Sequence, residues 1–221
     1  MISKSLRIVF LCLGLTGLAH ADAVDDMMKL VRFDSARDVM TLLVRGADPN
    51  MRDAQGQTPL LLALKEESAK VYKVLLDHPG TDVNAISQQG ETPLMLAAIK
   101  GRLDWVKELI TRGAIVDEPG WNAILYAASG PDNGTVDWLL QHGAELESRS
   151  PNGSTPLMLA ASYGSIDTAE HLLALGADPR VKNDQGLTAA DFAQRAGRDR
   201  LANKLRAAAA VIANPTPTAK P

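Results

Sequence analysis

Large aromatic side chains are scarce in this chain. Phe, Trp and Tyr make up 4% of its 221 residues, although hydrophobic residues make up 46%. A core with so few rings must be filled by Leu, Ala, Val and Met, and such small aliphatic side chains suit closely spaced helices. The sequence therefore favours a helical protein with tight helix contacts.

The chain also lacks an excess of positive charge. Its formal net charge is −3, and no cluster of Lys and Arg could follow a phosphate backbone. Nucleic acid is therefore not expected as a partner. The longest apolar run near the N-terminus, residues 8–18, is too short to span a bilayer as a helix.

That apolar run is part of a three-part pattern. Lys4 and Arg7 precede it, and "AHA" at residues 19–21 follows it, which is typical of a secretory signal peptide. We expect cleavage after Ala21 and a periplasmic protein that has no membrane segment after cleavage. The alternatives are an uncleaved anchor, a buried helix, and a lipoprotein anchor at Cys12, although Leu11 is not the small residue that a lipoprotein needs. Cys12 is the only cysteine, so the cleaved chain has no thiol for disulfides, catalysis or metal binding.

One short word recurs along the rest of the chain. It reads "GQTPLLLAL" at residues 56–64, "GETPLMLAA" at 90–98 and "GSTPLMLAA" at 153–161. Thr58, Thr92, Asn122, Thr155 and Thr188 align at spacings of 34, 30, 33 and 33 residues. A fixed period in this range is the signature of stacked repeats.

Each repeat predicts two helices and a turn. The threonine is a good N-cap and the proline suits the first helical position. The apolar positions of the first helix, among them Leu157, are expected in the core. The second helices carry apolar residues at helical spacing, namely Leu103, Val106, Leu109 and Ile110, and again Ile166, Ala169, Leu172 and Leu173. A turn-forming segment such as "DAQG" then predicts a projecting loop, which we call a finger.

The pattern T-P-L-x-x-A with a period near 33 resembles that of ankyrin repeats. The resemblance implies an all-α solenoid of about six helix-turn-helix units with projecting finger loops. Residues 22–52 would be an N-terminal capping repeat, 53–182 the inner repeats, 183–213 a C-terminal capping repeat and 214–221 a disordered tail. Two departures stand out: Leu61, Met95, Tyr126 and Met158 occupy the place where the family has histidine, and the finger before Asn122 is three residues shorter than the next one.

In ankyrin proteins the concave surface of finger tips and first helices binds other proteins. The residues that the repeat does not need for its own folding include Ser154 and six that we predict to contact a partner: Gln89, Glu91, Lys100, Trp121, Asn152 and Tyr163. Trp121 could instead be buried beneath the shortened finger. The sequence shows no enzyme motif, so we expect no catalytic, cofactor-binding or metal-binding residues.

The sequence also resembles small exported ankyrin proteins of proteobacteria, some of which are associated with periplasmic catalases. This resemblance implies a monomeric protein-binding scaffold in the bacterial periplasm that supports an oxidative-stress enzyme such as a catalase. The alternative is a secreted factor that binds a host or competitor protein. An enzyme would need a catalytic constellation that the sequence lacks.

Overall fold

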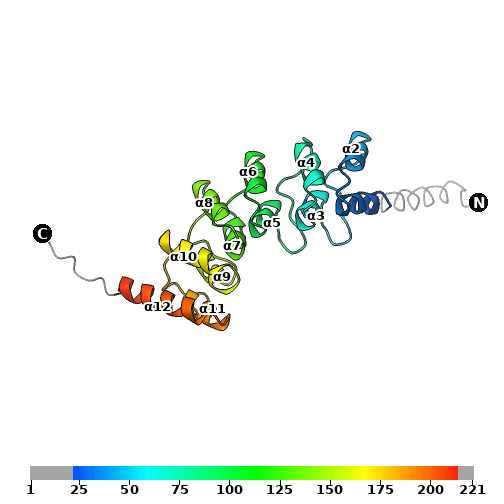
Figure 1. Cartoon of the computed structure of the whole chain (residues 1–221). Coiled ribbons are helices and arrows are strands. Elements are labelled where there is room, and N and C mark those ends of the chain that lie inside the picture. The colour runs from blue at the N-terminus through cyan, green and yellow to red at the C-terminus, as the bar shows by residue number, and fades with distance from the viewer. Residues whose placement is uncertain (1–21, 214–221) are drawn as a thin grey trace, which may run out of the picture. The chain divides into compact units, whose positions relative to one another are not determined.

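The chain folds as two compact units, Met1–Thr92 and Pro93–Pro221, which we call unit 1 and unit 2. The computed structural model describes residues 22–213. The expected signal peptide and the expected disordered tail lie outside these residues. Within residues 22–213 the secondary structure is entirely helical, which confirms the predicted fold class (Figure 1).

Unit 1 contains two repeats. A helix over residues 22–32 is followed by α2 (Ala36–Val44), α3 (Pro59–Lys65) and α4 (Ala69–Asp77). Helix α4 packs against both α2 and α3. The unit's core is mostly aliphatic and includes Met27, Val39 and Leu75, all of which are fully buried, together with one buried aromatic side chain, that of Tyr72. The capping repeat at the start of the described chain thus supplies core residues, although it also exposes the apolar side chains of Phe33 and Val44.

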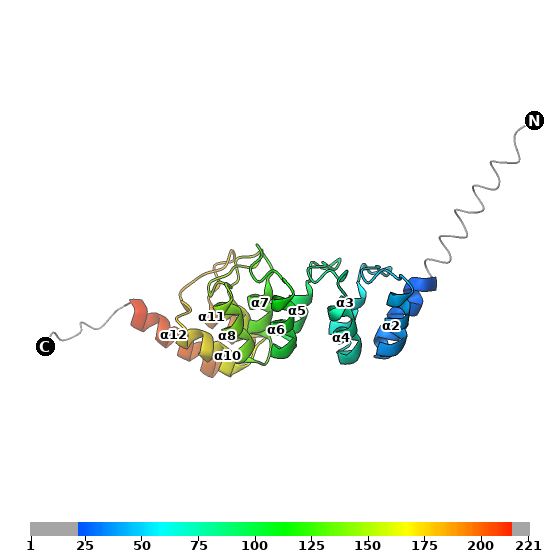
Figure 2. The same cartoon turned by 90° about the horizontal axis from the view of Figure 1, so that it is seen from above.

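Unit 2 contains four repeats in two rows of helices. Its helices are α5 (Pro93–Ile99), α6 (Leu103–Thr111), α7 (Ala123–Ser129), α8 (Asn133–Gln141), α9 (Pro156–Ser162), α10 (Ile166–Ala174), α11 (Ala189–Arg195) and α12 (Asp199–Ala213). The first helices α5, α7, α9 and α11 pack side by side in one row, and α6, α8 and α10 form a second row (Figure 1). The fingers of this unit project to one side of its helices (Figure 2).

The recurring threonine begins the first helices as expected. Thr58 Oγ1 accepts a hydrogen bond from the backbone N–H of Leu61 at 3.4 Å, which satisfies one of the free donors of the first turn. Asn122 performs the same role for α7, where its Oδ1 accepts from the N–H of Leu125 at 3.4 Å. The place of the family histidine in this repeat is therefore Leu125, and its assignment to Tyr126 was wrong by one residue.

A methionine completes one of these caps. Thr155 Oγ1 accepts from the N–H of Met158 at 3.4 Å, and the N–H of Thr155 in turn points at the sulfur of Met158 at 3.4 Å. The thioether is a weak acceptor, but it occupies the position of the acceptor in a capping box. The side chain that stands in for histidine thus keeps part of its local role.

The predicted core face of α9 is confirmed, because Leu157 is 1% exposed. Two other assignments were wrong. Ile166 is 48% exposed, because it is the first residue of α10 and lies before the buried stripe begins. Ser154 is buried rather than solvent-facing, because the next finger covers it and Asn183 Nδ2 donates a hydrogen bond to its hydroxyl at 3.5 Å.

Polar contacts join consecutive second helices of unit 2 in a regular way. The Lys107 ammonium lies 4.5 Å from the centre of the Trp138 ring and so joins α6 to α8. Asp137 contacts His171 at 2.6 Å between α8 and α10, and Glu170 contacts Lys204 at 2.7 Å between α10 and α12. Each contact joins the fifth residue of one helix to the sixth residue of the next. We call this series the second-helix ladder.

Candidate protein-binding surface

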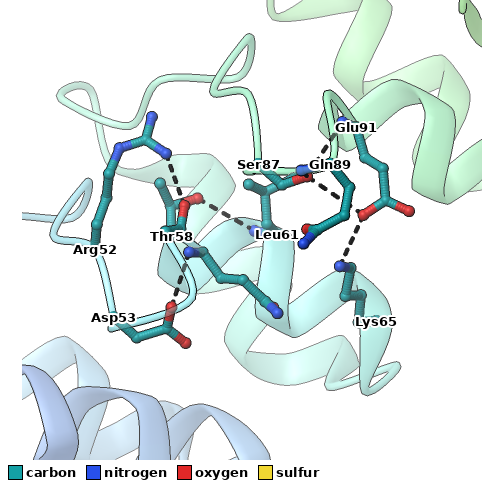
Figure 3. A network of polar contacts seen from close by, with 10 residues as sticks. Arg52, Asp53, Thr58, Leu61, Lys65, Ser87, Gln89 and Glu91 are labelled. Atoms are coloured by element: carbon teal, nitrogen blue, oxygen red, sulfur yellow. Dashed lines mark hydrogen bonds and ion pairs between the residues drawn. The ribbon is translucent and has the colours of Figure 1, made fainter.

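The finger tip at residues 87–91 of unit 1 is held by its own hydrogen bonds. The N–H of Ser87 donates to the carbonyl of Glu91 at 2.9 Å. The Ser87 hydroxyl oxygen accepts from the N–H groups of Gln89 and Glu91 at 3.2 and 3.1 Å (Figure 3). These contacts fix the turn and leave the predicted partner residue Gln89 exposed at its tip.

Glu91, in the same finger, has an internal partner. Its carboxylate lies 2.8 Å from the Lys65 ammonium, which comes from the end of α3 (Figure 3). The two side chains are 20% and 28% exposed, so this ion pair is partly shielded from water. The contact ties the finger to the first helix of the preceding repeat, and the role of Glu91 in partner binding stays a prediction.

In unit 2, Asn152 connects two neighbouring fingers. Its Oδ1 accepts from the Ser150 hydroxyl at 2.6 Å and from the N–H of Ser154 at 3.3 Å. Its carbonyl accepts from the N–H of Asp184 in the following finger at 3.1 Å. Asn152 is exposed, so it can contact a partner while it fixes the spacing of the two fingers.

The two predicted aromatic anchors are both exposed. Tyr163 is 71% exposed and Trp121 is 42% exposed, so Trp121 is not tucked beneath the shortened finger. The Trp121 ring packs edge to face on Tyr126 at 6.0 Å with an interplanar angle of 88°. This contact is a favourable aromatic geometry, and it holds the indole in place while part of it faces water.

The predicted partner residues lie at different ends of the first helices. Trp121 lies two residues before the start of α7, on the finger side, and Asn152 lies four residues before the start of α9. Lys100 and Tyr163 immediately follow α5 and α9, at the opposite ends of those helices, and both are exposed. A seven-residue helix is only about 10 Å long, so an extended partner segment can reach both ends. Gln89 and Glu91 belong to unit 1 and form a separate part of the predicted set.

The finger between α6 and α7, the third in the described chain, is shortened as predicted. Residues 112–122 connect α6 to α7, whereas residues 142–155, three more, connect α8 to α9. Within the short finger, the Asn122 side-chain amide donates hydrogen bonds to Asp117 Oδ1 and to the Glu118 carbonyl, each at 3.3 Å. The same amide donates to the Ser148 hydroxyl of the next finger at 3.2 Å. Asn122 is therefore both the cap of α7 and the link between two fingers.

A recess of about 280 Å³ lies between these two fingers, and sequence reasoning did not find it. Its lining consists of Asp117, Glu118, Pro119, Gly120, Asn122, Glu145, Ser148 and Arg149. Burial raises the pKa of the Glu118 carboxyl above its ordinary value. The one sequence signal for the recess is the shortened finger before Asn122, since the volume itself depends on how the two fingers lie.

Other kinds of site were also sought in residues 22–213. This part of the chain contains no group of three or more His, Cys, Asp or Glu side chains placed to hold a metal ion. None of its helices has the length and apolar character needed to cross a membrane.

Comparison with known proteins explains the repeated helix pairs. A family model described as ankyrin repeats (3 copies) matches residues 27–119, 106–183 and 124–212. The chain belongs to the ankyrin repeat family. Ankyrin repeats mediate interactions between proteins, and proteins of this kind are generally binding scaffolds rather than enzymes.

The curated relatives are ankyrin proteins of very different kinds. Human rabankyrin-5 is 28% identical over 184 residues, which covers 71% of this chain and 16% of that protein. The mouse B-cell lymphoma 3 protein homolog is 31% identical over 154 residues, covering 66% of this chain and 34% of that protein. This chain thus spans a small part of the relatives it matches, and they establish its family but not its partner.

One solved structure is similar to most of this chain. It is that of the predatory endopeptidase Bd0816 of Bdellovibrio bacteriovorus in complex with immunity protein Bd3460. One chain of that complex aligns with a TM-score of 0.68 and 26% identity, over 80% of this chain and 96% of that chain.

Proposed function

We propose that this protein is an exported ankyrin scaffold that binds a partner protein in the bacterial periplasm and has no catalytic activity of its own. The observation that carries this proposal is the exposure of Trp121 and Tyr163 on a stack whose own core is almost entirely aliphatic. Tryptophan and tyrosine are enriched among the residues that dominate binding energy at protein interfaces. The N-terminal pattern around Lys4, Arg7 and Ala21 supports export.

For the partner, the resemblance to small exported proteobacterial ankyrin proteins supports an oxidative-stress enzyme such as a catalase. A second candidate is a peptidase, which is supported by the likeness to a chain of the endopeptidase–immunity protein complex. In the first case the scaffold supports its enzyme, and in the second it restrains one. A released factor that binds a host or competitor protein is the alternative that export alone leaves open.

The test is capture from the cell envelope. The mature protein, tagged at its C-terminus, is used to retain partners from periplasmic extract, which are identified by mass spectrometry. The proposal expects one dominant partner, a catalase or a peptidase, and a mature N-terminus at Asp22. An intact N-terminus at Met1 on cytoplasmic protein, or recovery of the bound protein only from the culture medium, would refute the periplasmic assignment.

Substitutions connect the capture to the surface. Trp121→Ala together with Tyr163→Ala should weaken partner binding by about 2 kcal/mol or more, the scale of an interface hot spot. The melting temperature should change little, because neither side chain belongs to the buried core. The matched control is Trp105→Ala, since Trp105 is 3% exposed in the core of unit 2. The Trp105→Ala variant should lose stability while its folded fraction binds the partner normally. If the double variant bound the partner normally, the interface would not include Trp121 and Tyr163.

A further inference from the structure

The recess between the third and fourth fingers has an unbalanced set of charges. Three carboxylates line it, those of Asp117, Glu118 and Glu145, against the single guanidinium of Arg149. Arg149 is already engaged, because its Nη1 donates to the carbonyls of Gly153 and Lys182, each at 3.2 Å. The recess therefore presents negative charge that its own cation does not neutralise at close range.

Two of the three carboxylates have no counter-ion in the part of the chain that the structure describes. Asp117 accepts a hydrogen bond from the Asn122 amide at 3.3 Å. Among residues 22–213, no cationic side chain pairs with the carboxylate of Glu118 or of Glu145. Glu118 is partly buried, whereas Glu145 is exposed. Partial burial of the unpaired Glu118 carboxylate is unfavourable, and an opposite charge brought within a few ångströms would relieve this cost.

We propose that this recess receives one lysine or arginine side chain from a loop of the partner protein, while Trp121 packs against the same loop. The proposal rests on the proposed function and names the chemistry of the partner surface. The partner's contact loop is thereby basic, whether that partner is a catalase or a peptidase.

The size and the rim of the recess agree with such an occupant. At about 280 Å³ it is slightly smaller than the roughly 300–1,000 Å³ of ordinary small-molecule sites, so it suits one long side chain rather than a cofactor. Trp121 lies between Gly120 and Asn122, both of which line the recess, and 42% of it is exposed. Indole rings attract cations through their faces and pair well with arginine at interfaces.

The shortened finger gives the recess its access. With three residues fewer between α6 and α7 than between α8 and α9, the third finger offers less chain to cover Glu145 of the fourth. The missing length is thus where a protruding loop of the partner can enter.

The inference can be tested without knowing the partner. The probe is the capped peptide Gly-Gly-Arg-Gly-Gly, and its comparison is the same peptide with citrulline, which has nearly the shape of arginine but no charge. Both are titrated into isotopically labelled mature protein, and the amide signals of Gly120 and Ser148 and the indole signal of Trp121 are followed by NMR. The arginine peptide should shift these signals saturably, and the citrulline peptide should bind at least about threefold more weakly, as expected for one partly exposed charge pair.

Two pairs of variants define the site. Glu118→Gln with Glu145→Gln should reduce the affinity for the arginine peptide by roughly threefold to tenfold, since two attractive charges are lost. Asp25→Asn with Asp26→Asn removes the same net charge from exposed positions of unit 1 and should leave the affinity unchanged. Burial raises the pKa of the Glu118 carboxyl above its ordinary value. As the solution is acidified, Glu118 should therefore lose its charge at a higher pH than an ordinary glutamate does, and the affinity for the arginine peptide should begin to fall at that higher pH.

The outcomes separate this inference from the proposed function. Equal shifts with arginine and citrulline, equal losses in both pairs of variants, or a similar response to calcium chloride alone would overturn the cationic-loop assignment. If one of these results were found and the Glu118 and Glu145 variants still captured the partner fully, the proposed protein binding would stand. Only the role of the recess in that binding would then be rejected. Loss of partner capture in those variants, together with a charge-dependent peptide response, supports the inference.

Discussion

Replacement of Leu157 by alanine tests the core of unit 2 directly. Leu157 is 1% exposed and lies in α9, which packs against α7 on one side and α11 on the other. The change removes three carbon atoms, and at about 0.8 kcal/mol for each buried methylene the transfer contribution is roughly 2.4 kcal/mol. Helices on both sides limit how far the site can collapse, so a residual cavity should raise the total cost to about 2–5 kcal/mol.

The natural fluorophores make the assay specific to this unit. All three tryptophans, Trp105, Trp121 and Trp138, lie in unit 2, so tryptophan emission during urea denaturation reports on that unit alone. Leu157→Ala should lower the midpoint without a large change in slope, since the surface exposed on unfolding is nearly the same. The matched control is Leu175→Ala at a position that is 42% exposed, which should shift stability by less than about 0.5 kcal/mol. Equal effects of the two substitutions would show that the core face of α9 has been misassigned.

Three further predictions concern backbone packing and caps. Gly164→Ala should destabilise unit 2 by at least about 1–3 kcal/mol in the same fluorescence assay, because a Cβ there would lie 2.2 Å from the carbonyl oxygen of Ala128; a wild-type midpoint would mean that this close approach is relaxed in solution. Asp191→Asn should cost about 0.5–2 kcal/mol at pH 7, since hydrogen bonds from Thr188 hold the pKa of Asp191 below its ordinary value and the ionised form caps α11. Because the folded-state pKa is lowered, this stabilisation is present above the ordinary aspartate pKa and is lost as the pH falls through the folded-state pKa. The difference in unfolding free energy between variant and wild type should therefore vanish in acid. A difference that persisted in acid would exclude ionisation of Asp191 as its source. Lys65→Met should lower stability by no more than about 1 kcal/mol in urea melts followed by circular dichroism, since its ion pair with Glu91 is partly exposed, and a larger loss would identify that contact as essential to the finger.

The sequence predicted most of the repeat but not the details at its edges. Thr58, Thr155 and the leucines that follow them carry their local roles in every copy, so period and capping chemistry placed the helices and the core residue Leu157. Ile166 was misplaced because helical spacing alone does not say where the buried stripe begins. Ser154 was misplaced because its burial depends on Asn183 in the next finger, twenty-nine residues away.

The candidate surface was predictable only in part. The exposure of Trp121 and Tyr163 follows from their places beside the first helices, which the repeat period fixes. The internal contacts of Glu91 and Asn152 could not be read from the period, because they depend on which side chains neighbouring segments bring close. The recess beside Trp121 is a property of two fingers together, so the shortened finger was visible in the sequence while the volume that it opens was not.

The second-helix ladder affects which repeats of this chain can be duplicated without loss of an attractive contact between second helices. A tandem copy of the repeat that contains α10 would set Glu170 of one copy against His171 of the next, which still permits a contact between an acid and an imidazole. A tandem copy of the repeat that contains α8 would set Asp137 against Trp138 and lose an attractive pair. Consensus-based lengthening of the scaffold should therefore be tolerated better after α10 than after α8, and the order of the repeats is encoded in their side chains as well as in the connectivity of the chain.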